Sequence, residues 1–195
     1  MSKNVLIALL MIGMQLQAQP LRFVEFQINS DLLAPPIRLT DTGQQIFPPI
    51  GWQGQSNEMI ASLQATISSG FDTTVMDIPE VTAYFIGRDS TNFLIVSILG
   101  FSHDFSFLPP DFADYLSDDG KKKIQIDQYK INSLKVRQYV IETPIAVNYK
   151  LFCLTSINTL QLDFILGKES NEETVHSVES SIGSLKYVNG NPRTE

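Results

Sequence analysis

The sequence predicts an α+β domain in which a mainly antiparallel sheet carries helices on its faces. Apolar residues alternate with polar ones along several short segments, as in strands, and recur every three or four positions along three others, as in helices. The segments follow the order strand, helix, two strands, helix, four strands, helix. The four consecutive strands are joined by connections so short that neighbours must be antiparallel. One antiparallel layer covered by helices is the economical arrangement of these elements.

Three helices are predicted, each with its own start or stop signal. Ser56 is a good N-cap for the first helix, which should end before Gly70. The second helix begins at Pro109 and Pro110, because proline is favoured in a first turn. The third helix spans about residues 170–186 and has one apolar face. The apolar residues that recur in these helices are Met59, Ile60, Leu63 and Ile67 in the first, Phe112, Ala113, Tyr115 and Leu116 on the expected buried side of the second, and Val175, Val178, Ile182 and Leu185 on one face of the third.

Strands are predicted wherever apolar residues alternate or form short runs. The segment 93–99 is apolar at six of its seven positions, so we expect a central strand covered on both faces. Many prolines and glycines between residues 29 and 51 leave room only for short extended pieces. The predicted strands are residues 22–28, 81–86, 93–99, 124–131, 134–141, 145–154 and 160–166, with extended pieces around 37–39 and 46–47.

The N-terminus has the pattern of a secretory signal peptide. Lys3 precedes an apolar run over residues 5–14, and Ala18 is a small residue suited to cleavage. The run is well short of the roughly 20 residues that cross a bilayer as a helix. We therefore expect an exported protein without a transmembrane segment, released in soluble form to the periplasm or the extracellular space. The predicted organisation is a signal peptide (1–18), an N-terminal strand and proline-rich lead-in (19–46), a single α/β/α domain (47–187) and a polar tail (188–195).

Charge and cysteine content narrow the classes of partner. The formal net charge is −7, and it becomes −8 once residues 1–18 and their single lysine are removed. A negative protein repels nucleic acid and anionic lipid, so neither is expected as a partner. The acidic residues are scattered, which favours a role in solubility. Cys153 continues an alternating apolar pattern, so we expect it in the core rather than in a disulfide.

No familiar catalytic, phosphate-binding or metal-binding motif occurs in the sequence. His176 has Glu172 four residues before it and Glu179 three after it, which could place a metal-binding group on one helical face. A solvated helix flank explains the same three residues without a metal. We therefore predict no catalytic residue, no metal site, no cofactor and no enzymatic activity.

His103 lies in the most informative stretch of the chain. If residues 99–107 form a strand, His103 falls on an aromatic face. That face could be a small-molecule pocket with one titratable group, or His103 could be a structural residue near the sheet edge. The same aromatic residues could instead form an exposed patch for a protein partner, or cover the core beneath the second helix. The candidate binding residues are Phe101, His103, Phe105, Phe107, Phe112 and Trp52.

Three local motifs carry a resemblance to a known family. They are the segment Phe47-Pro48-Pro49-Ile50-Gly51-Trp52 before the first helix, the hairpin over residues 132–139, and the Ser-Ile-containing closing helix over residues 178–185. Over residues 47–187 the chain resembles the family of PsbP-type extrinsic photosystem proteins, Mog-type Ran-binding proteins and periplasmic DcrB-like proteins. The resemblance implies a non-catalytic α/β/α sandwich that binds or supports other proteins. It gives Trp52 a packing role and offers no shared catalytic residue.

These observations favour an exported accessory or protein-interaction domain whose partner is another protein. One alternative is a periplasmic small-molecule or lipid-binding protein that uses the apolar face near His103. The other is a hydrolase whose reactive residues are too far apart in the sequence to recognise.

Overall fold

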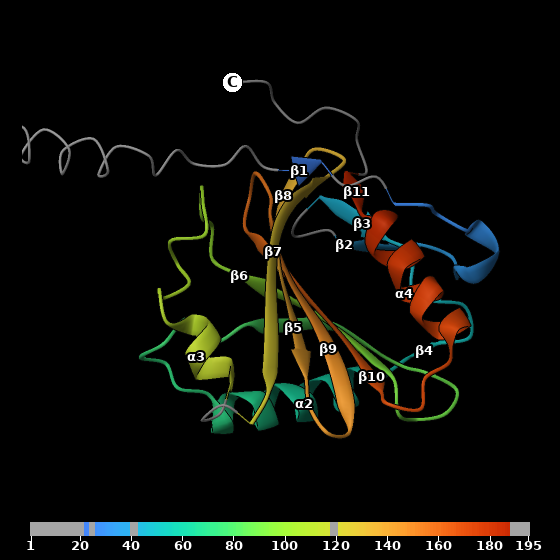
Figure 1. Cartoon of the computed structure of the whole chain (residues 1–195), viewed down its shortest axis with the longest axis horizontal. Helices are drawn as coiled ribbons and strands as arrows, with labels where there is room; N and C mark the ends of the chain where they lie inside the picture. Colours follow the sequence, from blue (N-terminus) through green and yellow to red (C-terminus); the bar gives the residue numbers. More distant parts are fainter. Residues whose placement is uncertain (1–21, 24–25, 40–42, 118–120, 188–195) are drawn as a thin grey trace, which may run out of the picture.

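The computed structural model describes residues 22–23, 26–39, 43–117 and 121–187. The predicted signal peptide (1–18) and polar tail (188–195) lie outside the described residues. Within the described residues the protein has an eight-stranded sheet, a three-stranded sheet and three α-helices (Figure 1). The predicted α+β class, with a mainly antiparallel sheet and helices on its faces, is confirmed.

The main sheet has the strand order β1-β7-β8-β9-β10-β6-β5-β4. Its strands are β1 (Arg22–Phe23), β4 (Gln53–Gly54), β5 (Glu80–Ile86), β6 (Phe93–Leu99), β7 (Lys123–Ile131), β8 (Leu134–Glu142), β9 (Ala146–Leu154) and β10 (Thr159–Gly167). All neighbours are antiparallel except β1, which runs parallel to β7. The predicted paired strands and four-strand meander are therefore confirmed. The strand β6 lies between β10 and β5, the interior position that its apolar sequence predicts.

The proline-rich lead-in forms a second, smaller sheet. Strands β2 (Ile37–Leu39) and β3 (Gln44–Ile46) pair with each other, and β11 (Lys186–Tyr187) pairs with β3. The expected short extended pieces are thus present. The expectation of one β-layer is wrong, because the lead-in joins residues near the C-terminal end of the described chain instead of extending the main sheet. Ile46 is fully buried, so this small sheet closes part of the core.

The opening strand is shorter than predicted. The alternating pattern predicts a strand over residues 22–28, but β1 covers only Arg22–Phe23, and residues 26–29 are not in a strand. The Asn29 amide donates to the Ser180 hydroxyl oxygen at 3.1 Å, a bond to a helix rather than to a neighbouring strand. An alternating pattern of apolar residues therefore occurs here in a segment that lies along a helix, and not only in strands of a sheet.

The helices are α2 (Asn57–Gly70), α3 (Phe112–Ser117) and α4 (Glu172–Gly183). Ser56 is the N-cap of α2 as predicted, and its hydroxyl oxygen accepts from the Met59 amide at 3.4 Å. None of the residues of α2 is fully buried, although Ile60, Leu63 and Ile67 of its apolar repeat are half-buried. The Gln64 side chain ties the helix to the start of β5. In α3, Tyr115 is 44% exposed rather than buried, while Phe112 is buried as expected.

Two hydrophobic cores lie on opposite faces of the main sheet. In Figure 1, α4 lies to the right of the sheet and α3 to its left. Val178 and Ile182 of α4 belong to one core, and Phe112 of α3 belongs to the other. Cys153 of β9 is fully buried in the α4-side core, as predicted, and burial raises the pKa of its thiol to about 12. The next residue along the strand, Phe152, is fully buried in the α3-side core.

Candidate binding surfaces

The structure separates the predicted aromatic cluster into buried and exposed members. Phe105 and Phe112 are 5% and 3% exposed and belong to the α3-side core, against which Phe107 packs. Phe101 is 50% exposed, and His103 is also exposed. We call Phe101, His103 and the cavity beside them the Phe101 corner. Of the loop residues proposed for binding, Phe101 and His103 are the ones that solvent reaches most readily.

The expected strand over residues 99–107 is wrong, because β6 ends at Leu99. Asp104 turns the chain into a loop: its backbone carbonyl accepts from the Ser102 hydroxyl at 2.7 Å, and its carboxylate accepts from the Ser106 amide at 2.9 Å. Hydrogen bonds from the Ser106 side chain and amide lower the pKa of the Asp104 carboxyl. These local bonds offer the backbone an alternative to a strand ladder. The loop turns Phe105 inward and leaves Phe101 and His103 outside.

The loop is fastened to the sheet beneath it. The Arg137 guanidinium of β8 lies 4.6 Å from the centre of the Phe105 ring, a cation–π contact. Phe107 meets Phe152 edge-on at a ring distance of 5.7 Å. Outside, the Phe101 and His103 rings lie edge to face, 4.6 Å apart. The exposed pair is therefore presented by an ordered loop.

A cavity of about 240 Å³ opens beside Phe101. Its apolar lining comes from Val75, Met76, Leu99, Phe101 and Phe107, and Thr73, Thr74 and Asp77 add polar groups. At the edge of this cavity the Asp72 carboxylate holds Thr74 in place, because it accepts hydrogen bonds from the Thr74 amide and hydroxyl at 2.9 and 2.6 Å. The cavity is large enough to receive a side chain and small for a whole ligand, since ligand pockets usually span roughly 300–1,000 Å³.

Trp52 lies away from the Phe101 corner. Its ring packs in a tilted arrangement 6.5 Å from Phe164, and Trp52 is partly buried against the α4-side core. Phe101 lies beside the α3-side core, on the other face of the sheet. Trp52 therefore does not join the loop aromatics in one surface, and its position fits the packing role that the family resemblance implies.

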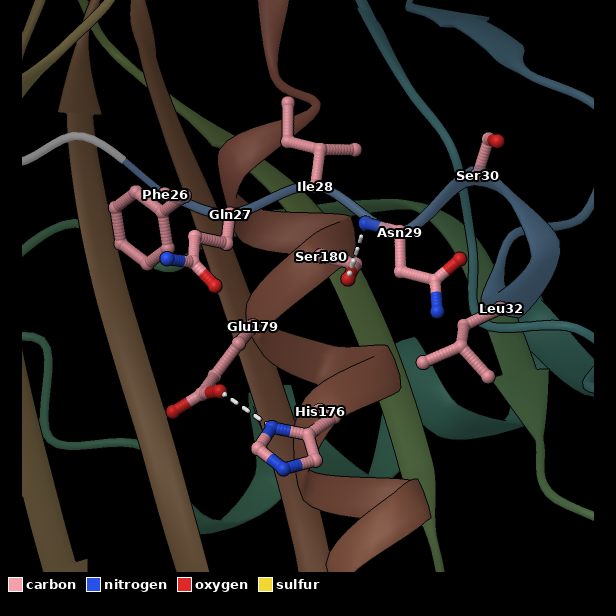
Figure 2. A pocket seen from close by; sticks show the side chains of 9 residues that line it. All are labelled: Phe26, Gln27, Ile28, Asn29, Ser30, Leu32, His176, Glu179 and Ser180. Carbon is pink, nitrogen blue, oxygen red and sulfur yellow. Dashed lines mark hydrogen bonds and ion pairs between the residues drawn. The ribbon is translucent and has the colours of Figure 1, made fainter.

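A second surface, which the sequence did not indicate, follows α4. Figure 2 shows residues 26–32 crossing this helix, with the Asn29 amide bonded to Ser180. Gly183, the last residue of α4, permits the close approach, since a Cβ atom there would lie 2.4 Å from the Cβ of Phe26. Serines on the same helix bind the chain before α2: the Ser181 hydroxyl donates to the Phe47 carbonyl at 2.6 Å. Small residues on α4 thus allow backbone to pack directly on the helix.

Two adjoining cavities lie along this crossing, and we call them together the α4 groove. The larger, of about 720 Å³, is lined by Phe26, Gln27, Ile28, Asn29, Ser30, Leu32, His176, Glu179 and Ser180. The smaller, of about 320 Å³, is lined by Phe26, Gln125, Asp127, Gln128, Tyr129, Gln138, Tyr149, Glu179 and Ile182. Phe26 and Glu179 line both cavities, so they stand where the two meet.

His176 and its two glutamates border the larger cavity. His176 Nδ1 lies 3.1 Å from Glu179 Oε2, as Figure 2 shows, and Nε2 lies 3.4 Å from Glu172 Oε1. The hydrogen bond with Glu179 raises the pKa of His176. The imidazole side chain is 57% exposed, which confirms the predicted solvated flank. Within the part of the chain that the structure describes, no group of three or more His, Cys, Asp or Glu side chains is placed to hold a metal ion.

A buried ion pair crosses β9 and β10. Lys150 Nζ lies 2.6 Å from Asp163 Oδ1, and the two side chains are 16% and 7% exposed. Asp163 also accepts from Gln161 at 2.6 Å and from Asn148 at 3.1 Å. The sequence does not indicate this pair, because its two residues are adjacent only through strand pairing. With both carboxylate oxygens occupied, the pair fits a structural role better than proton transfer.

Comparison with known proteins shows a likeness of fold but none of sequence. No protein-family model and no curated protein matches the sequence. The fold resembles the solution structure of cyanobacterial PsbP (CyanoP) from Synechocystis sp. PCC 6803, with a TM-score of 0.52 over 78% of this chain and 91% of that chain. The fold is PsbP-like. At 12% sequence identity the likeness concerns the fold alone, and it confirms only the fold that the motif resemblance implies. None of the helices in the described residues is both long and apolar enough to span a membrane.

Proposed function

We propose that this protein is an exported, non-catalytic accessory protein that binds another protein through the Phe101 corner. The observation that carries the proposal is the half-exposed Phe101 ring, held by an ordered loop beside an apolar cavity. The PsbP-like fold supports the proposal, because the motifs of this chain resemble a family of non-catalytic binding proteins. The signal-peptide pattern of residues 1–18 supports export to the periplasm or beyond.

Physical chemistry favours a protein partner at this corner. Aromatic residues dominate the binding energy of protein interfaces when they are desolvated in a well-packed pocket. Phe101 keeps half of its surface in water, so covering it recovers hydrophobic free energy at about 25 cal/mol per Å² of apolar area. The hydrogen bonds of Asp104 already fix the loop, so little conformational entropy is lost on binding.

The alternatives have weaker support in the geometry. A small-molecule site near His103 would need a pocket, but Phe105 and Phe112 fill the core and the remaining cavity is about 240 Å³. A hydrolase would need a base that contacts a nucleophile. The contacts that the structure shows for the two histidines are with Glu172 and Glu179, and with the Phe101 ring. These contacts are typical of surface residues.

Affinity purification from the native host tests the proposal with a matched pair of variants. Phe101→Ala removes the proposed anchor, and Ile126→Ala removes an equally exposed apolar side chain on β7. Losing a dominant interface residue costs about 2 kcal/mol or more, so Phe101→Ala should lower partner recovery by more than about tenfold. Ile126→Ala should recover the same partner as the wild type. Equal recovery with both variants would contradict the proposed surface.

A further inference from the structure

We infer that the α4 groove binds an organic cation, meaning a ligand with an ammonium or guanidinium group. The inference is independent of the Phe101 corner, because it rests on different residues on the other face of the main sheet. It follows from three features of the groove: aromatic walls, carboxylates on two separate elements, and a lining in which His176 is the one basic side chain among the described residues.

The smaller cavity has aromatic walls. Phe26 and Tyr129 lie 6.2 Å apart between ring centres, and Tyr149 of the neighbouring strand β9 completes the lining. Tyr129 is 5% exposed, and its hydroxyl donates to Gln138 Oε1, so its ring is held in place. The face of an aromatic ring is negative and attracts ammonium and guanidinium groups. The partly exposed rings of Phe26 and Tyr149 therefore provide both an apolar surface and a preference for positive charge, and the buried Tyr129 supports Phe26 from behind.

Two carboxylates add negative charge from different elements. Asp127 comes from β7 and Glu179 from α4, and both line the smaller cavity. Asp127 Oδ2 accepts a hydrogen bond from the Gln125 side chain at 2.8 Å. Asp127 belongs to none of the ion pairs that the described residues form. Glu179 uses Oε2 for His176. Each carboxylate thus has one oxygen that takes no part in these hydrogen bonds.

This combination selects an organic cation over a bare metal ion. A metal ion needs several lone-pair ligands at short range, whereas aromatic rings supply none. An alkylated ammonium or a guanidinium can rest its carbon surface on the rings and direct its charge to the carboxylates. The cavity of about 320 Å³ is at the small end of ligand-pocket sizes, which suits a group of that size. The net charge of −7 also favours encounter with a cation.

The test is an NMR titration of the purified full chain with two cations and one neutral control. Choline supplies a free quaternary ammonium, and Nα-acetyl-arginine amide supplies a guanidinium on a peptide unit. The control, 3,3-dimethyl-1-butanol, has nearly the shape of choline without its charge. We expect at least one cation to shift the resonances of Tyr129 and Tyr149, with the alcohol binding about tenfold more weakly or not at all. Tighter binding of choline would identify the natural ligand as a free amine. Tighter binding of Nα-acetyl-arginine amide would identify it as a side chain of a partner protein.

Isosteric variants locate the site without disturbing the core. Asp127→Asn combined with Glu179→Gln removes both charges at exposed positions, and Glu173→Gln makes the same kind of change elsewhere on α4. The double variant should weaken cation binding by about tenfold, and Glu173→Gln should leave it within about twofold. The inference is wrong if neither cation shifts the groove resonances at millimolar concentration, if the alcohol binds as tightly as choline, or if the double variant binds like the wild type.

Discussion

At Gly183 the N-terminal segment passes too close to α4 to leave room for a side chain. An added Cβ atom would lie 2.4 Å from Phe26 Cβ and 3.2 Å from Ile28 Cγ1, so one element must move. We expect Gly183→Ala to lower the free energy of unfolding by about 1–3 kcal/mol, the usual cost of overpacking. Urea denaturation measures this change.

The control for that prediction is Gly70, the last residue of α2. Nothing lies within 4 Å of a Cβ atom built there. Gly70→Ala should therefore be neutral or stabilising by up to about 1 kcal/mol, because alanine is the better helix former. Equal destabilisation by both substitutions would show that the Phe26 contact does not explain the need for glycine at position 183.

His176 is expected to titrate above its ordinary pKa of 6.5, because its hydrogen bond with Glu179 favours the protonated ring. The stabilisation from a raised histidine pKa is complete below the unfolded value and is lost as the pH rises through the folded value. NMR titration of the His176 ring measures this pKa directly. Glu179→Gln should bring the value back toward 6.5, and an unchanged value in that variant would rule out Glu179 as the main cause.

At the level of elements, the Lys150–Asp163 pair links β9 and β10 within the buried part of the sheet. Lys150→Met leaves a buried carboxylate without its cation, and breaking a buried pair in this way costs roughly 3 kcal/mol or more. Asp163→Leu leaves the ammonium group without its partner. We expect the double variant to be more stable than the sum of the two single changes predicts.

Urea denaturation of the four proteins completes a double-mutant cycle and gives the coupling energy of the pair. A coupling of about 1 kcal/mol or more is expected, because both side chains are largely buried. Additive single changes would mean that Gln161 and Asn148, rather than Lys150, stabilise the Asp163 carboxylate.

Elements fixed by local pattern could be predicted from the sequence, whereas those set by distant contacts could not. The apolar alternation of β9 and β10 and the Ser56 N-cap of α2 are properties of a few neighbouring residues. The three-stranded sheet depends on residues 44–46 meeting residues 186–187, far away in the sequence. For the loop after Leu99 the local pattern predicts a strand that is not there. Its aromatic residues alternate as in a strand, but Asp104 turns the backbone.

The two candidate surfaces differ in the same way: one is formed by residues close together in the sequence, and the other by residues far apart. The Phe101 corner could be found because its aromatic residues are close in the sequence, although only the structure shows which rings are exposed. The α4 groove could not be found, because Phe26, Asp127 and Glu179 come from three separate regions of the chain. The one local signal was the group of small residues at the end of α4, at Ser180, Ser181 and Gly183, followed by the C-cap residue Ser184. Such a stripe indicates that something packs closely on a helix without saying what.

At the scale of the whole molecule, export predicts a defined new N-terminus. Cleavage after Ala18 leaves a chain that begins at Gln19. Intact-mass analysis and N-terminal sequencing of protein recovered outside the cytoplasm should find this species. Protein that retains Met1 and stays with the cytoplasmic or membrane fraction would contradict export.

The main sheet also separates the two proposed surfaces. The Phe101 corner lies with the α3-side core, and the α4 groove lies with the α4-side core. A protein partner on one face therefore leaves the other face accessible to a cationic ligand. This arrangement lets each surface be tested with variants that leave the other intact.

Site-specific photo-crosslinking in native cells tests the protein-binding role most directly. A photoreactive phenylalanine analogue at position 101 should crosslink to a discrete partner protein, since we place this ring within an interface. The same analogue at position 126, equally exposed in the free protein, should give little or no such product. Crosslinks of equal yield from the two positions, or no protein adduct at position 101, would contradict the role of the Phe101 corner in binding a partner.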